Sequence, residues 1–324
     1  MNRLRPSGSR AQGRGGTPLR RSGRQGLWYG LGAYAIWGLF PIYWKLIDFA
    51  PAGQIIAHRI VWSFLLLACV RMVAVTRRLP RERLLGSRRV VGLYTAAAML
   101  IAVNWFVYVW AVNHGFILET SLGYFITPLV NVLLGVVILR ERLRTLQWVA
   151  IALAATGVGY LAIVYGDVPW IAIALAVTFG TYGLVKKKAP LRSVAGLTLE
   201  TGLLFLPALA YLVVAENGGA GPFLQADGSR RLLMAAAGPV TTLPLLLFAA
   251  AVQRIPLSVI GILQFIAPTI QFFLGTLVYK EPFSQQQLVG FTFVWAAVIV
   301  FTAESVLTRT HQRGTMPVLD EGEF

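Results

Sequence analysis

Long apolar stretches follow one another from Gly26 to Leu307, with only short polar breaks between them. Most are about 20 residues long, enough for a helix to cross the roughly 30 Å hydrocarbon layer of a bilayer. They lack the alternation over about ten residues that is typical of membrane β-strands, so the pattern predicts helices. The ten segments are Leu27–Ile47, Ile55–Val75, Val90–Val112, Leu118–Leu139, Leu146–Tyr165, the shorter Trp170–Val185, Val194–Ala215, Leu232–Val252, Ser258–Tyr279 and Gln286–Leu307. We therefore predict an all-α polytopic membrane protein with ten transmembrane helices.

Part of this pattern occurs twice, because Ser121–Val158 and Gly261–Val298 align without a gap at an offset of 140 residues. Identical pairs include Phe125/Phe265, Ile126/Ile266, Pro128/Pro268, Leu134/Leu274, Gly135/Gly275, Glu141/Glu281, Gln147/Gln287 and Val149/Val289. Apolar residues often match by chance in such segments, so the matched proline, glycine, glutamate and glutamine carry more weight. The chain is therefore interpreted as a duplication, a common origin of transporter folds.

A repeat of five helices crosses the membrane an odd number of times, so the second copy must run in the opposite direction. We therefore predict two inverted five-helix repeats, residues 26–166 and 167–308, with a disordered basic tail at 1–25 and a C-terminal tail at 309–324. Inverted repeats favour two related conformations, each open to one side of the membrane, with a site between the halves.

Basic residues gather on one predicted side of the membrane. They lie in the first 25 residues and in the connections near residues 77–89, 140–144 and 186–192. Because short cytoplasmic loops collect Lys and Arg, we expect both termini to be cytoplasmic in a bacterial inner (plasma) membrane protein. Topology thus accounts for the net charge of +16 without nucleic-acid binding, while the tail remains free to touch anionic membrane lipids. The single cysteine, Cys69, excludes an intramolecular disulfide and a thiol-based metal site.

The chain also resembles a known family, the RarD permeases of the EamA branch of the drug/metabolite transporter (DMT) superfamily. The resemblance spans Gly26 to Leu307 and rests on residues spread over both halves. They include Ala33-Tyr34-Ala35-Ile36-Trp37-Gly38, His58-Arg59, Trp62-Ser63, Asn104-Trp105, Ser121-Leu122-Gly123-Tyr124-Phe125-Ile126, Glu141-Arg142, Glu200-Thr201 and Pro268-Thr269. One departure is Thr127, where the family pattern has asparagine before the proline. The resemblance implies a ten-helix inner-membrane permease linked to chloramphenicol sensitivity, without naming a physiological ligand.

Three ionisable residues stand out among those inside the predicted helices, where a charge costs roughly 2.5 to 3.5 kcal/mol at the centre: His58, Arg59 and Glu200. Arg59 and Glu200 occupy equivalent helices of the two halves, 141 residues apart. One hypothesis is that Arg59 attracts an anionic substrate group or pairs with Glu200 in one state, with Glu200 as a proton carrier. The alternative is a permanent structural ion pair, with Arg59 reaching toward the interface. His58 is a candidate for coupling or a hydrogen-bonded packing residue.

Polar and aromatic residues in the third helix suggest a cavity wall, because Asn104 and Tyr108 share a helix face at a spacing of four residues. Helix packing is the alternative. Tyr124 and Gln264 each precede a matched proline, Pro128 or Pro268, by four residues, where the proline frees a carbonyl. These prolines are candidate hinges or fixed kinks.

Glu141 and Glu281 are interpreted as solvated salt bridges to Arg140, Arg142 and Lys280, and Glu304 in the same way.

These observations favour a secondary transporter for a small polar or amphipathic metabolite or drug, with H⁺ as a candidate coupling ion and a homodimer as a candidate assembly. We expect no cofactor, no metal and no enzymatic activity, because the chain lacks a paired-histidine metal motif, a nucleophile elbow and a phosphate-binding glycine loop. A non-transporting assembly or sensor protein is the main alternative, and an intramembrane lipid-modifying enzyme is the weaker one.

Overall fold

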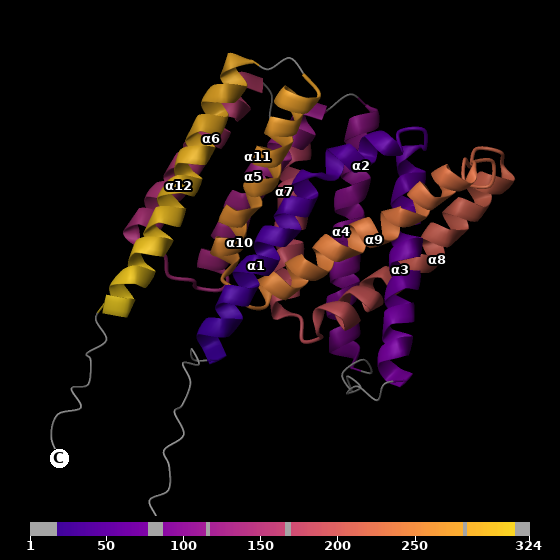
Figure 1. Cartoon of the computed structure of the whole chain (residues 1–324), viewed down its shortest axis with the longest axis horizontal. Helices are drawn as coiled ribbons and strands as arrows, with labels where there is room; N and C mark the ends of the chain where they lie inside the picture. The colour runs from indigo at the N-terminus through magenta and orange to yellow at the C-terminus, as the bar shows by residue number, and fades with distance from the viewer. Residues whose placement is uncertain (1–17, 77–86, 115–116, 166–169, 281–283, 315–324) are drawn as a thin grey trace, which may run out of the picture.

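The computed structural model describes residues 18–76, 87–114, 117–165, 170–280 and 284–314, and every regular element within them is helical (Figure 1). The elements are α1 (Pro18–Gly38), α2 (Phe40–Leu46), α3 (Ala52–Thr76), α4 (Arg88–Asn113), α5 (Ile117–Val137), α6 (Thr145–Tyr165), α7 (Trp170–Lys188), α8 (Ser193–Asn217), α9 (Gly228–Val252), α10 (Leu257–Gln264), α11 (Ile266–Phe273), the π-helical turn η2 (Leu274–Val278) and α12 (Gln285–Gly314).

The ten predicted crossings are confirmed within these described residues, although two of them are broken. The first consists of α1 and α2, separated at Leu39, and the ninth of α10, α11 and η2, separated at Phe265. A proline follows each break by two or three residues, Pro41 or Pro268, and its missing N–H weakens the preceding turn. Six crossings consist of a helical run at least 20 residues long that is apolar enough to span a bilayer.

Helix ends extend beyond the predicted limits at both ends of the chain. The first helix begins at Pro18, so the predicted disordered tail 1–25 is helical over its last eight residues. The last helix continues to Gly314, six residues into the predicted C-terminal tail 309–324. Hydropathy could not reveal these extensions, because the added turns are polar and project beyond the apolar segment.

Helix packing follows the symmetry of an inverted repeat, in which each crossing of the first half has an equivalent five crossings later. The pairs α3 with α8, α6 with α12, and α5 with α10 each join equivalents directly. Other contacts come in matched pairs: α4 packs on α7 as α9 packs on α1, and α3 packs on α9 as α8 packs on α4. The described start of α1 and end of α12 lie at the same end of the bundle, hereafter the terminal end (Figure 1).

The repeat extends to unusual backbone conformations. Arg140, after α5, and Lys280, after η2, are equivalent residues with φ of 54° and 52°. A non-glycine residue in this left-handed region costs roughly 1–2 kcal/mol, and both halves carry it at the same corner. Two local solutions of this kind argue for a common origin of the halves.

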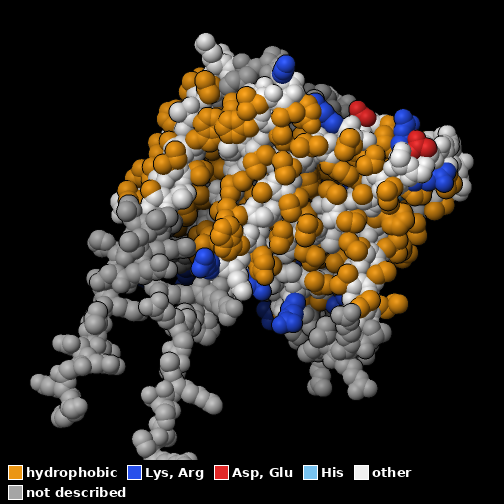
Figure 2. Space-filling model, in the orientation of Figure 1, with side chains coloured by type: hydrophobic (Ala, Val, Ile, Leu, Met, Phe, Trp, Pro, Cys, Tyr) orange, Lys and Arg blue, Asp and Glu red, His pale blue; other side chains and the backbone are white. Residues whose placement is uncertain are grey.

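Apolar side chains cover the outside of the bundle, whereas charged ones gather near its two ends (Figure 2). Large hydrophobic residues on this surface include Ile163, Met72 and Leu206, which are 82%, 72% and 71% exposed. Exposed apolar surface on this scale belongs in lipid rather than water. The protein is therefore a multi-pass membrane protein, and its polar side chains inside the bundle are the candidates for function.

Candidate functional site

A central cavity of about 130 Å³ lies between the two halves. Its lining comes from Tyr34, Trp37, Phe40, Arg59, Ile101, Asn104, Trp105, Tyr108, Thr120, Gly123, Tyr124, Thr127, Leu175, Phe179, Leu245, Gln264, Ala267, Pro268 and Gln271. Most of these residues lie in the part of their helix that is farther from the terminal end. The cavity thus occupies the opposite half of the bundle.

Six of the nine sequence-predicted candidates line this cavity. They are Arg59, Asn104, Tyr108, Tyr124, Gln264 and Pro268. Three others, His58, Glu200 and Pro128, are not among its lining residues.

Arg59 is the cation of the cavity, and neighbouring side chains fix its direction. Its Nε donates a 2.8 Å hydrogen bond to Oγ1 of Thr241 on α9. The guanidinium carbon lies 4.4 Å from the ring centroid of Trp105 and 5.1 Å from that of Trp44. Such cation–π contacts stabilise an arginine without neutralising it. Arg59 therefore does not reach outward to the interface, as one alternative supposed.

Amide side chains of the cavity connect helices across the bundle. Asn104 Nδ2 lies 2.9 Å from both the Leu175 carbonyl oxygen and Thr178 Oγ1, which ties α4 to α7. Gln264 Oε1 accepts a 2.8 Å hydrogen bond from Asn131, and this pair joins the two halves between α10 and α5. The cavity wall is thus held by polar contacts between helices of the two halves.

Aromatic rings form much of the remaining wall. Tyr108 and Tyr124 meet edge to face at 6.1 Å between centroids, and Trp37 contacts Phe179 at 6.0 Å. The hydroxyl of Tyr34 is buried and has no hydrogen-bond partner within the described part of the chain. A buried unsatisfied hydroxyl is costly, so it marks a place where a ligand gains by binding.

His58 faces away from the cavity lining. Its Nδ1 accepts a 3.2 Å hydrogen bond from Trp62, and its ring lies 4.9 Å from that of Phe223. Pro128 stays inside the continuous helix α5, whereas Pro268 follows the break between α10 and α11. The carbonyl oxygen of Pro128 lies 2.5 Å from the position that a Cβ at Gly261 would take, so α5 and α10 are in backbone contact there.

Arg59 and Glu200 do not pair in this conformation, which is contrary to the alternative of a permanent ion pair and leaves pairing in the other state a prediction. Each is the eighth residue of a 25-residue helix, α3 or α8, but the two helices start from opposite ends of the bundle. Each residue lies five positions from the centre of its helix, and the two are displaced in opposite directions. At 1.5 Å per residue they are about 15 Å apart in depth. Inverted equivalents meet only near the midplane, and these residues lie on either side of it.

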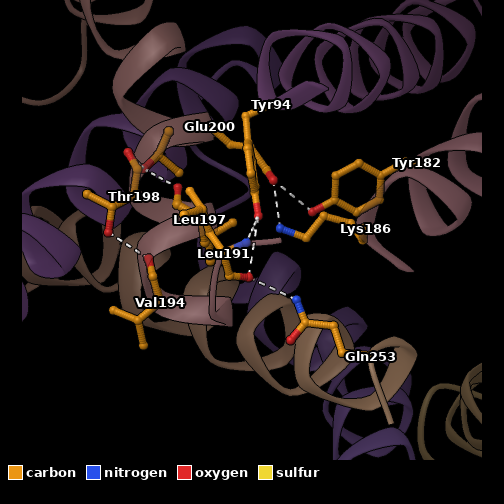
Figure 3. A network of polar contacts seen from close by, with 10 residues as sticks. Tyr94, Tyr182, Lys186, Leu191, Val194, Leu197, Thr198, Glu200 and Gln253 are labelled. Atoms are coloured by element: carbon orange, nitrogen blue, oxygen red, sulfur yellow. Dashed lines mark hydrogen bonds and ion pairs between the residues drawn. The ribbon is translucent and has the colours of Figure 1, made fainter. Parts of the chain in front are cut away.

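Glu200 instead belongs to a buried cluster near the terminal end (Figure 3). Its Oε1 lies 2.6 Å from Nζ of Lys186, and the side chains are 2% and 1% exposed. Tyr182 donates a 3.1 Å hydrogen bond to the other carboxylate oxygen. The ring centroid of Tyr94 lies 5.4 Å from Nζ of Lys186, and the Tyr94 hydroxyl forms hydrogen bonds with the backbone of Leu191. We call this group the Lys186–Glu200 cluster.

Glu141 is not the solvated salt bridge that its arginine neighbours suggested. Its carboxylate accepts hydrogen bonds of 2.7 and 2.9 Å from the backbone N–H groups of Leu257 and Ser258, and one of 2.7 Å from Ser258 Oγ. A carboxylate of the first half thus caps α10 of the second half. Its equivalent, Glu281, lies outside the described residues.

A contact within the second half adds to it at the same end, because Lys187 Nζ donates hydrogen bonds to the carbonyl oxygens of Val252 and Ile255 at 3.1 and 2.6 Å. Glu304 does form a salt bridge, at 2.8 Å, but with Arg144 of the other half, and it is itself buried. The terminal end is therefore sealed by polar contacts between the halves, while the cavity occupies the other end.

Comparison with known proteins supplies a family context. Residues 24–163 and 168–303 each match the model of the EamA-like transporter family. An uncharacterized transporter of Bacillus subtilis strain 168, YojE, is 46% identical over 87% of this chain and 95% of its own length.

Proteins named RarD are similar over comparable lengths. The RarD protein of Streptomyces exfoliatus is 43% identical over 90% of this chain and 93% of its own, and that of Escherichia coli K12 is 40% identical over 88% and 96%. A crystal structure of 18% identity superposes with a TM-score of 0.65 over 86% of this chain and 96% of that one, which supports the fold alone.

Proposed function

Because the chain belongs to the EamA-like transporter family, we propose that it is a secondary transporter that moves a small polar or amphipathic molecule through the central cavity. The observation that carries this proposal is an inverted repeat that surrounds a polar cavity at one end and is sealed between the halves at the other. Alternating access needs both features. When the two halves exchange conformations, the sealed end opens and the end that holds the cavity closes.

We place the terminal end in the cytoplasm. Described basic residues at this end include Arg88, Arg140, Arg142 and Lys188, and cytoplasmic loops collect such charges. The described conformation is then closed to the cytoplasm, with its cavity in the outer half of the membrane. This orientation makes it the outward-facing member of the two states.

Proton coupling through Glu200 is a narrower proposal, and its surroundings restrict it. The carboxylate of Glu200 lies 2.6 Å from the ammonium group of Lys186, so on this proposal Glu200 carries a proton in the state in which Lys186 has moved away from it. Lys186 lies near the end of α7, beside the contacts that seal the terminal end. Proton uptake would therefore accompany opening toward the cytoplasm.

The proposed function argues against the alternatives drawn from the sequence. An assembly or sensor protein has no need of a cavity between two inverted halves with a sealed opposite end. Within the described residues no three His, Cys, Asp or Glu side chains gather as a metal site would require. The absence of enzymatic activity stays a prediction from the sequence. The homodimer remains a prediction from the sequence.

Flux through proteoliposomes tests transport. We expect at least one compound of a panel of metabolites and amphenicols to accumulate or exit with wild-type protein and to stop with Arg59→Ala. Arg71→Ala, a matched loss of a cation twelve residues along the same helix, should leave flux unchanged. Absence of flux for the whole panel, with folded and inserted protein, would count against a transporter.

A further inference from the structure

We propose that the central cavity selects a small planar monoanion, a carboxylate on a flat apolar body, and that Arg59 binds the carboxylate. This inference rests on the proposed function in taking the cavity as the substrate site. It goes further by assigning charge, shape and a recognising atom group.

The charge of the cavity is unbalanced. Among its lining residues Arg59 is basic and none is Asp or Glu. The Lys186–Glu200 cluster shows the opposite arrangement, because its buried cation has a carboxylate at 2.6 Å. A charge removed from water without a partner is expensive, so a cation left facing a cavity gains most when an anion arrives.

The guanidinium of Arg59 has free donors in a fixed direction. Its Nε is occupied by Thr241, and no hydrogen bond from either terminal nitrogen is found within the described part of the chain. The rings of Trp105 and Trp44 lie 4.4 and 5.1 Å from the guanidinium carbon and carry no negative charge that would neutralise it. Two parallel N–H groups match the two oxygens of a carboxylate, a geometry that lysine does not offer.

The rest of the cavity suits a flat body with few polar groups. Trp37, Phe40, Tyr108 and Phe179 present ring surfaces, and a planar ligand packs on these with little loss of conformational entropy. The unpartnered hydroxyl of Tyr34 offers one further polar contact. A volume of about 130 Å³ is below the roughly 300–1,000 Å³ of most drug-sized pockets, so the occupant is small.

Three planar probes of nearly equal size separate charge from shape: benzoate, benzamide and benzamidine are an anion, a neutral molecule and a cation. Binding of radiolabelled benzoate to the purified full chain in detergent, with the other two as competitors, measures the preference directly. We expect benzoate to bind at least tenfold more tightly than benzamide, and benzamidine not to compete. Equal affinity of benzoate and benzamide, preferential binding of benzamidine, or no binding of benzoate overturns the proposal.

Variants then assign the preference to a residue. Arg59→Gln should reduce benzoate affinity about tenfold or more, to the level of benzamide, while Arg59→Lys retains a weaker preference. Arg71→Gln on the same helix serves as the matched control and should bind like wild type. Tyr34→Phe, which removes only the unpartnered hydroxyl, should weaken benzoate binding severalfold. If Arg59→Gln does not fold, Arg59→Lys and Tyr34→Phe decide, and unchanged benzoate affinity in both refutes the assignment.

Failure of this inference differs from failure of the transporter proposal. If benzoate does not bind but a neutral or cationic compound crosses the membrane in an Arg59-dependent way, the anion assignment is wrong and transport stands. If benzoate binds through Arg59 and neither it nor any panel compound crosses the membrane, the anion site stands and the transporter proposal falls.

Discussion

Glu141→Gln should loosen the terminal end and favour the conformation that opens there. The carboxylate of Glu141 accepts three hydrogen bonds from Leu257 and Ser258, all from the other half of the chain. Glutamine has nearly the same shape, but one of its two terminal groups is a donor, so at least one of these donors loses its acceptor. The negative charge at the start of α10 is lost as well.

The magnitude follows from these two losses. An unsatisfied donor costs about 1–3 kcal/mol, and a charge at a helix N-terminus contributes about 0.3–1 kcal/mol. Together they cost about 1.3 to 4 kcal/mol, and we take a value in the lower half of this range, about 2 kcal/mol, as the penalty for the closed terminal end. Because each 1.4 kcal/mol is a factor of ten, the population open at that end should rise about 30-fold.

Cysteine accessibility measures this population. In a Cys69→Ser background, which removes the single native cysteine, Val252→Cys places a thiol at a position that is 0% exposed at the sealed end. A membrane-impermeant maleimide added from the terminal side should label it about 30-fold faster with Glu141→Gln, as long as the open state stays minor. Arg142→Gln, which removes a neighbouring exposed charge, is the control and should leave the rate unchanged.

A second buried reporter separates opening from unfolding. Val294 on α12 is also 0% exposed but packs with α6, away from the seal. Val294→Cys should remain protected in the Glu141→Gln background. An unchanged labelling rate at position 252, or equal acceleration at both positions, refutes the reasoning that Glu141 holds the terminal end closed.

Three further predictions concern stability and ionisation. Glu200→Gln leaves Lys186 buried without a counterion and should destabilise the protein by about 3–5 kcal/mol in detergent denaturation, whereas Glu200→Leu combined with Lys186→Met should recover most of the loss. Gly261→Ala places a Cβ 2.5 Å from a backbone oxygen of α5, so we expect about 1–3 kcal/mol of destabilisation in the same assay, and wild-type stability would contradict the backbone contact. Hydrogen bonds from the hydroxyl of Ser229 and from the backbone N–H of Arg230 lower the pKa of Asp227 at the start of α9. Its capping contribution is thus fully present above the unfolded-state pKa and lost as pH falls through the lower folded value. In an NMR titration Ser229→Ala should move the pKa of Asp227 upward.

The sequence predicted the crossings and part of the cavity lining because both depend on the cost of placing side chains in lipid. A long apolar segment has few alternatives to a membrane helix, and the duplicated prolines and glutamates marked the repeat. Arg59, Asn104 and Gln264 are costly in a bilayer, so their presence inside such segments indicated a polar interior. Tyr34 and Trp37 escaped notice as lining residues because aromatic residues are equally at home in packing.

The partners of the charged residues could not be predicted, since they depend on depth and direction. Lys186 heads a run of three lysines, a pattern typical of a cytoplasmic loop, and its side chain nevertheless turns inward to Glu200. The partners of Glu141 include backbone N–H groups, which leave no signature in a sequence. The 141-residue spacing of Arg59 and Glu200 suggested proximity, although inversion moves equivalent residues to opposite depths.

Inversion also links the two charged groups in function. In this structure the cavity is at the Arg59 end of the bundle. When the two halves exchange conformations, the terminal end opens instead, and Glu200 occupies there the position equivalent to that of Arg59. An anion leaving toward the terminal end would therefore pass the Lys186–Glu200 cluster. A bare carboxylate there would repel it, whereas Glu200 presents no negative charge to the anion while it is paired with Lys186 or, once Lys186 has moved away, while it carries the proton proposed above. The ion pair thus serves the exit path of the substrate as well as the stability of the closed end. Glu200→Gln leaves Lys186 as a bare cation, which should slow the exit of an anionic substrate. Slower release of bound benzoate toward the terminal side, with binding at Arg59 unchanged, would demonstrate it, and unaltered release would show that the pair is structural only.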